Sequence, residues 1–171
     1  MYVWKVPGQH CREMPDGTRK ITFTSGSTGS PKGVCLSDVH QWSVAQSLAD
    51  TISIKCPRHL CLLPFSTLLE NIAGVYTPLL SGGEIVIPSD RDRGLLGSSQ
   101  LDSKTLLKCI TGTQPQTMIL VPQILTLLVQ ACAQGWHPPE SLQFVAVGGG
   151  KLAPQIIRQA ANLGLPVYQG Y

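Results

Sequence analysis

Short apolar runs alternate with helical segments along most of this 171-residue chain. The runs expected to form strands are residues 59–63, 84–87, 118–121, 142–147 and 167–168. The segments expected to form helices are residues 39–51, 68–80, 103–110, 122–133 and 154–163. Residues 88–100 are charged and rich in Gly and Ser, which predicts a mobile surface loop. The alternation predicts an α/β fold with a layered, largely parallel sheet and flanking helices.

A loop rich in glycine and hydroxyl residues follows the apolar run at residues 21–23. Its glycines can adopt positive φ and bring backbone N–H groups towards an anion, and its hydroxyls are further donors. Lys32 adds a mobile positive charge suited to terminal phosphate oxygens. The residues of this predicted phosphate cradle are Thr24, Ser25, Gly26, Ser27, Thr28, Gly29, Lys32 and Gly33. Composition alone fits a solvated turn equally well, so the order of the residues must decide.

The order of the residues argues against a Walker P-loop. That motif would require glycine at the position of Pro31 and a hydroxyl residue at the position of Gly33. Pro31 also disfavours helical geometry at Ser30, so a helix cannot run back through the loop. A P-loop NTPase is therefore not expected.

The string TSGSTGSPKG at residues 24–33 resembles the phosphate-binding signature of the adenylate-forming superfamily. This superfamily includes acyl-CoA synthetases, adenylation domains of nonribosomal peptide synthetases, and firefly luciferase. Residues 63–71 resemble the family segment beside the acyl pocket, and residues 147–152 with 166–171 resemble its adenine-binding portion. Residues 1–19 contain several prolines and glycines and show little periodicity, which predicts an extended lead-in. The resemblance implies that residues 20–171 are part of the family's large N-terminal AMP-binding domain, truncated at both ends.

By this resemblance Lys32 is catalytic and acts on phosphate charge. The implied nucleotide-binding residues are Thr24, Ser25, Gly26, Ser27, Thr28, Gly29, Lys32, Gly148, Gly149, Gly150 and Tyr171. The implied cofactors are ATP, Mg²⁺ and coenzyme A, with the family's magnesium ligand expected beyond Tyr171. From the residues themselves, both glycine-rich loops follow predicted strands. Because ligands collect at the carboxyl ends of parallel strands, we expect the two loops to meet at one sheet edge, although three glycines also suit a simple flexible turn.

The resemblance implies that the whole enzyme activates a carboxylic acid as an acyl-adenylate and transfers the acyl group to coenzyme A, whereas this chain alone is expected to be inactive. No charged group is placed to hold an α-amine, which favours an apolar, fatty acid. Thr67 stands where many family members have histidine, so its role beside the acyl pocket is open. Residues expected to line that pocket, or to pack in the core, are Leu68, Leu69, Ile72, Ala73 and Val75. The alternatives are a peptide synthetase adenylation domain with a carrier-protein partner, a fatty acyl-AMP ligase, and a non-catalytic nucleotide-binding relic.

Composition narrows the classes of binding partner and the cellular compartment that we expect. The formal net charge is +3, and the basic residues are scattered, which argues against a nucleic-acid surface. Six cysteines without a C-x-x-C pair are typical of reduced thiols in a cytoplasmic protein. Cys56 and Cys61 flank His59, but four residues separate them and no second pair follows, so no metal site is expected. No signal peptide and no membrane-spanning segment are expected.

Overall fold

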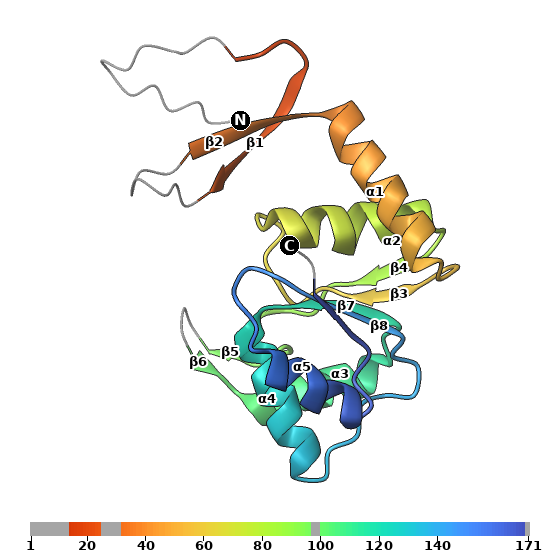
Figure 1. Cartoon of the computed structure of the whole chain (residues 1–171), viewed down its shortest axis with the longest axis vertical. Helices are drawn as coiled ribbons and strands as arrows, with labels where there is room; N and C mark the ends of the chain where they lie inside the picture. The colour runs from red at the N-terminus through yellow and green to blue at the C-terminus, as the bar shows by residue number, and fades with distance from the viewer. Residues whose placement is uncertain (1–13, 25–31, 97–99, 170–171) are drawn as a thin grey trace. The chain divides into compact units, whose positions relative to one another are not determined.

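A computed structural model describes residues 14–24, 32–96 and 100–169, coloured from red to blue in Figure 1. The chain divides into two compact units, Met1–Gln41 and Trp42–Tyr171. The division falls within helix α1 (Asp38–Ile52), which begins where the backbone N–H of His40 donates to the Ser37 hydroxyl oxygen at 3.3 Å. This helix confirms the prediction for residues 39–51 to within one residue at each end.

The first unit contains a two-stranded antiparallel sheet of β1 (Thr18–Thr24) and β2 (Lys32–Ser37). Gly33 lies opposite Phe23, and a Cβ at Gly33 would come within 3.1 Å of the Ile21 side chain. The strand predicted before the cradle at residues 21–23 is therefore present as part of β1. The prediction that the strand before the cradle belongs to the parallel sheet is wrong, because among the described residues β1 pairs only with β2. A chain that returns after a short loop can only pair antiparallel, since a parallel return requires a crossover of a dozen or more residues.

The second unit is built on a five-stranded sheet in the order β4-β3-β7-β8-β9, with every neighbouring pair parallel. Its strands are β3 (Arg58–Leu60), β4 (Glu84–Val86), β7 (Thr117–Leu120), β8 (Phe144–Val147) and β9 (Val167–Gln169). The chain moves outward from β3 to β4 and then back past β3 to β7. This reversal makes the sheet doubly wound, with its switch point between β3 and β7, and confirms the predicted fold class.

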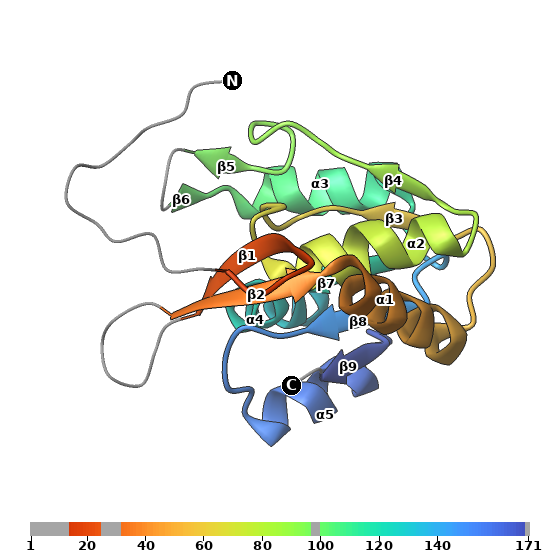
Figure 2. The same ribbon diagram turned by 90° about the horizontal axis from the view of Figure 1, so that it is seen from above.

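Helices cover both faces of this sheet. The π-helix η1 (Glu70–Tyr76) runs into α2 (Thr77–Leu80) and connects β3 to β4. The helices α3 (Ser103–Thr113), α4 (Pro122–Ala133) and α5 (Pro154–Asn162) follow β6 (Gln100–Leu101), β7 and β8. Figures 1 and 2 show α2 on one side of the sheet and α3, α4 and α5 on the other. This is the arrangement that right-handed crossovers produce when the direction of winding reverses.

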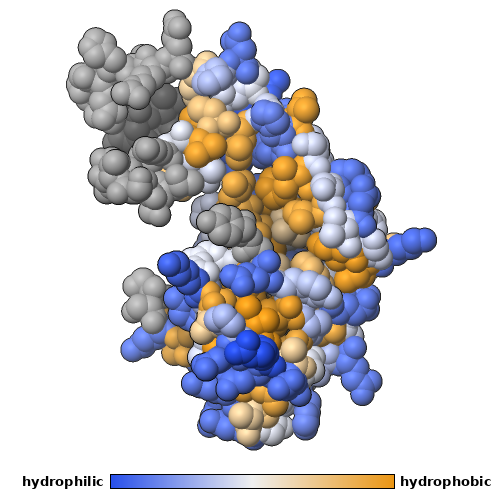
Figure 3. Space-filling model, in the orientation of Figure 1, coloured by the Kyte–Doolittle hydropathy of each residue, from blue (hydrophilic) through white to orange (hydrophobic). Residues whose placement is uncertain are grey.

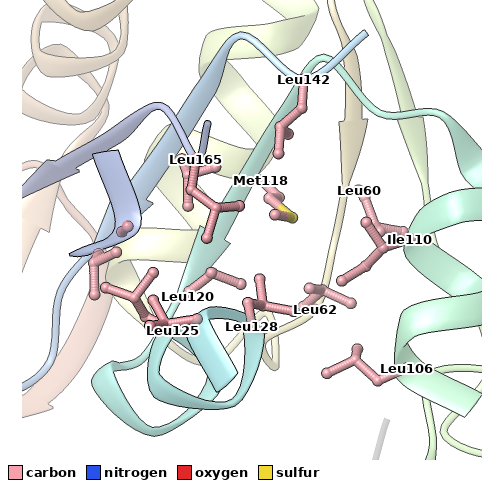
Figure 4. Close-up of a cluster of buried hydrophobic side chains, with 14 residues drawn as sticks. Leu60, Leu62, Leu106, Ile110, Met118, Leu120, Leu125, Leu128, Leu142 and Leu165 are labelled. Atoms are coloured by element: carbon pink, nitrogen blue, oxygen red, sulfur yellow. The ribbon is translucent and has the colours of Figure 1, made fainter. Parts of the chain in front are cut away.

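The alternation of side chains along the strands creates two cores. Leu60, Met118, Leu120, Val145 and Val147 lie on the face covered by α3, α4 and α5, and they join the large cluster drawn in Figure 4. On the other face, a smaller cluster of Leu63, Ile119 and Ala146 packs against Leu69 and Ala73. Neighbouring strand residues therefore belong to different cores, as period-two alternation requires.

The region predicted as a mobile surface loop contains ordered features. The strands β5 (Leu95–Leu96) and β6 (Gln100–Leu101) pair antiparallel, and the Arg93 guanidinium donates to the Leu62 carbonyl at 3.0 Å. Asp102 caps helix α3 and accepts from the Lys104 backbone N–H at 3.0 Å. The charge and glycine content of residues 88–100 do not predict the pairing of β5 with β6.

Helices α1 and α2 contact one another and leave apolar surface exposed. Trp42 stacks on Tyr76, the last residue of η1, with ring centroids 5.1 Å apart, and the Thr77 hydroxyl oxygen lies 3.4 Å from the Ala45 carbonyl oxygen. Trp42 and Val44 are still 49% and 51% exposed, and Figure 3 shows apolar side chains over these helices. Within the described ranges, none of the helices combines the length and the apolar character that crossing a membrane requires.

Candidate functional site

The carboxyl ends of three adjacent strands form one edge of the parallel sheet. The segment Leu63-Pro64 follows β3, Val121-Pro122 follows β7, and Gly148-Gly149-Gly150 follows β8. Ligands of doubly wound proteins bind outside this edge, at or near the switch point. The edge at the ends of β3, β7 and β8 is therefore the candidate binding site of the second unit.

The loop Gly148-Gly149-Gly150 fits closely between its neighbours. The Gly148 N–H donates to the Leu120 carbonyl at 3.1 Å, so the loop begins against the end of β7. A Cβ at Gly148 would lie 2.6 Å from Leu69 Cδ2, and a Cβ at Gly150 would lie 3.3 Å from Pro122 Cγ. Gly149 has a φ of +79°, a conformation that L side chains rarely adopt.

The sequence requires glycine at these positions for two physical reasons, close packing at Gly148 and backbone conformation at Gly149. Gly148 is buried, whereas Gly149 and Gly150 are exposed. The loop thus presents bare backbone at the carboxyl edge, where a planar ligand can approach N–H and C=O groups directly. This favours a binding role over a flexible turn.

Strand β9 brings the end of the described chain next to this loop. Gln169 lies opposite Val147, so β9 ends beside the point where β8 leads into Gly148. Tyr168 stacks on Phe144 with ring centroids 4.9 Å apart. Tyr171, the predicted adenine-stacking residue, lies outside the described residues, two positions after Gln169.

The predicted phosphate cradle lies mostly outside the described residues. Ser25, Gly26, Ser27, Thr28 and Gly29 fall within the undescribed range 25–31. The backbones flanking that range are described, and Thr24 lies directly opposite Lys32 in the last pair of the β1–β2 ladder. The two ends of the cradle are thus held together by strand pairing. The roles of its side chains stay predictions.

The expected acyl-pocket residues are largely core residues. Ile72 is 6% exposed, and Leu69 and Ala73 pack on the smaller core cluster. Thr67 is half-buried, and its backbone N–H donates to the Pro64 carbonyl at 2.9 Å. Helical spacing explains these apolar positions without a ligand.

The structure adds a buried polar group that the sequence interpretation had not assembled. His59 Nδ1 lies 2.9 Å from Thr117 Oγ1, and His59 Nε2 lies 3.2 Å from Glu70 Oε1. Cys61 lies on the same side of β3 as His59, with its Sγ 4.0 Å from the Gly74 carbonyl oxygen. Burial, reinforced by the charge of Glu70, raises the pKa of the Cys61 thiol. The sequence analysis weighed Cys56 and Cys61 around His59 and expected no metal site; in the structure Cys61 is buried beside His59, whereas Cys56 is exposed.

Comparison with known proteins decides the family. The sequence model of the family described as AMP-binding enzyme matches residues 4–171, almost the whole chain. This chain belongs to that family. The adenylate-forming resemblance of the cradle sequence is therefore confirmed.

Similar proteins span several kinds of synthetase. The PKS-NRPS hybrid synthetase acdB of Aspergillus candidus is 27% identical over 160 residues, which are 92% of this chain and 6% of that protein. A 2-succinylbenzoate–CoA ligase of Staphylococcus aureus is 26% identical over 157 residues, 91% of this chain and 29% of the ligase. This chain therefore corresponds to less than a third of either relative.

A solved structure gives the fold. The O-succinylbenzoate coenzyme A synthetase MenE of Bacillus subtilis, in complex with AMP, superposes with a TM-score of 0.72 at 22% identity. The match covers 92% of this chain and 30% of the MenE chain. The doubly wound sheet and its helices are thus an adenylate-forming N-terminal fold.

Proposed function

We propose that this chain forms part of the ATP site of an AMP-forming ligase, which activates a carboxylic acid as an acyl-adenylate and passes the acyl group to coenzyme A. The observation that carries the proposal is the Gly148–Gly150 loop, which exposes backbone at the carboxyl edge of the sheet. Membership of the AMP-binding enzyme family and a fold shared with an AMP-bound synthetase support it.

The proposed division of labour follows from charge. A carboxylate can attack an anionic phosphate only if donors and cations stabilise the negative charge that develops on the phosphoryl oxygens. Lys32 and the hydroxyl and N–H donors of Thr24 to Gly29 would supply this at the β- and γ-phosphates. The Gly148–Gly150 backbone would contact the adenine, and Tyr171 would stack on it. Mg²⁺, when bound, would neutralise further phosphate charge.

Two positive-φ glycines give a matched test of the loop. Gly149 and Gly164 both have φ +79°, and a Cβ at either would meet no atom closer than 3.8 Å. Alanine at either position should therefore cost a similar amount of stability, about 1–2 kcal/mol from the left-handed backbone conformation. We expect Gly149→Ala to weaken binding of a fluorescent ATP analogue at least about tenfold, equivalent to about 1.4 kcal/mol, whereas Gly164→Ala should bind like wild type. If the two variants bind the analogue with equal affinity, the Gly148–Gly150 loop is not part of the nucleotide site.

The acid and its acceptor need a separate test. We propose that the acid substrate is apolar, and a fatty acid is the first candidate. Aromatic acids are the second candidate, because 2-succinylbenzoate–CoA ligases are among the relatives. The hybrid synthetase among the relatives favours, as the second candidate function, an adenylation domain that loads a carrier protein. Pyrophosphate release by the full reading-frame product should be measured with a panel of fatty, aromatic and amino acids. Release followed by coenzyme A consumption supports the ligase, and release with amino acids but without coenzyme A consumption supports the adenylation domain.

A further inference from the structure

Three side chains with metal-ligating atoms meet in the interior of the second unit. His59, Cys61 and Glu70 have exposed fractions of 1%, 1% and 0%, and one ligand atom from each lies within 4.8 Å of the others. The group lies on the face of the sheet that η1 covers. The proposed nucleotide chemistry makes no use of it.

The hydrogen bonds of this group are incomplete. Glu70 Oε1 has His59 Nε2 as its partner at 3.2 Å, but Glu70 Oε2 is buried and has no hydrogen-bond partner among the residues that the structure describes. A buried carboxylate oxygen without a partner is costly, and a buried thiol beside it relieves little of the cost. Such an orphaned atom in a native core requires an explanation, and an ion is one of the few that fit.

We propose that His59, Cys61 and Glu70 bind a structural Zn²⁺ ion. Thiolate, imidazole and carboxylate are the ligand types that zinc takes in proteins. A thiolate and a carboxylate carry two negative charges, so a dication makes the buried site neutral. Glu70 Oε2 then gains a partner, which is either the zinc ion itself or a water molecule in the fourth coordination position. The Cys61 thiol proton passes to solvent when the metal binds.

The spacing of the His59 and Glu70 ligand atoms is close to what zinc requires. Zn–N and Zn–O bonds of about 2.0–2.2 Å in a tetrahedron place the two ligand atoms about 3.4 Å apart, and His59 Nε2 and Glu70 Oε1 are already 3.2 Å apart. Thr117 Oγ1 lies 2.9 Å from His59 Nδ1. Donation by Nδ1–H to this hydroxyl leaves the Nε2 lone pair for the metal, which is the outer-shell arrangement typical of zinc-bound histidine.

The fold holds the three ligands in place. Residues 59 and 61 share one face of the β3 segment because side chains alternate along it. Glu70 is the first residue of η1, and π-helical turns occur frequently at functional sites. Gly74 lies over the ligands: a Cβ there would be 2.7 Å from His59 Nε2 and 2.8 Å from Glu70 Oε1. Glycine at this position lets the helix approach the group.

The test is zinc content. The whole chain is stripped with chelator, incubated with ZnCl₂, desalted and analysed by mass spectrometry of the metal, with circular dichroism to confirm folding. We expect one zinc per chain in wild type, background zinc in Cys61→Ser, and wild-type zinc in the matched variant Cys56→Ser, whose thiol is exposed. Thr117→Val should lower the zinc affinity about tenfold, because it removes the partner of Nδ1.

A measurement on the wild type guards against variants that do not fold. Co²⁺ added to the stripped chain should give a thiolate-to-cobalt charge-transfer band that Zn²⁺ abolishes. Folded wild-type chain without bound zinc, or zinc retained fully by folded Cys61→Ser, would overturn the proposal. Either result would leave the three residues as a hydrogen-bonded group of the apoprotein. Because the readout is metal content, it is independent of nucleotide binding.

Discussion

Gly74→Ala should destabilise the second unit even though alanine favours helices. The new Cβ would lie 2.7 Å from His59 Nε2, 2.8 Å from Glu70 Oε1 and 3.1 Å from Glu70 Cδ, all closer than ordinary contacts. Helix propensity alone would give a gain of about 1 kcal/mol. Overpacking a core costs about 1–3 kcal/mol, and leaving a buried hydrogen-bonding group unsatisfied costs about 1–3 kcal/mol. We expect a net loss of about 2–4 kcal/mol, because the new Cβ would overpack the site and disturb the His59–Glu70 hydrogen bond.

The assay is urea unfolding of the chelator-treated chain, followed by circular dichroism, with Gly112→Ala as the matched control. Gly112 is in helix α3, and a Cβ there would meet nothing within 4 Å. The same substitution should therefore stabilise by about 0.5–1 kcal/mol at position 112 and destabilise at position 74. A neutral or stabilising Gly74→Ala would refute the packing of η1 against the His59–Glu70 pair.

Two further substitutions test the core and a helix cap. Leu120 is 0% exposed in the large core, so Leu120→Ala should lower the free energy of unfolding by about 2–5 kcal/mol. Leu96 is 55% exposed, so Leu96→Ala should change this free energy by less than about 0.5 kcal/mol in the same denaturation assay. The Thr105 hydroxyl, and then the Lys104 N–H, hold the pKa of Asp102 below its ordinary 3.8. Its stabilising contribution is therefore complete above about pH 4 and is lost as the pH falls through the lower folded pKa. Asp102→Asn should accordingly be less stable than wild type at pH 7, and the difference in thermal midpoint should vanish in strong acid; a difference that grows towards low pH would contradict the cap.

The sequence predicted most of the second unit because its local signals agree. Proline at the first helical position placed α4 at residues 122–133, as the structure has it. Glycine after the last apolar residues ended α5 before Gly164, which has φ +79°. The sequence also predicted strand β8 and the glycines directly after it, and these residues form one half of the candidate site.

Pairing between distant residues was not predictable in the same way. The direction in which β1 pairs depends on where the chain goes after the loop. Strand propensity does not predict this direction. Asp102 and Ser103 are both good capping residues, so sequence alone could not choose between neighbours. Residues 59, 70 and 117 meet only because β3, η1 and β7 pack together. The sequence signals of that group were His59 two residues before Cys61 and a glutamate inside an apolar helical segment.

The decisive measurement is calorimetric titration of the whole chain with ATP and Mg²⁺, comparing wild type with Lys32→Ala and with Lys104→Ala, an exposed lysine on α3. If the residues of the cradle form an ATP site, wild type and Lys104→Ala should bind with the same affinity, and binding should be lost in Lys32→Ala. If the folded wild-type chain does not bind ATP, or if Lys32→Ala binds as tightly as wild type, this chain does not contain the phosphate site proposed for it.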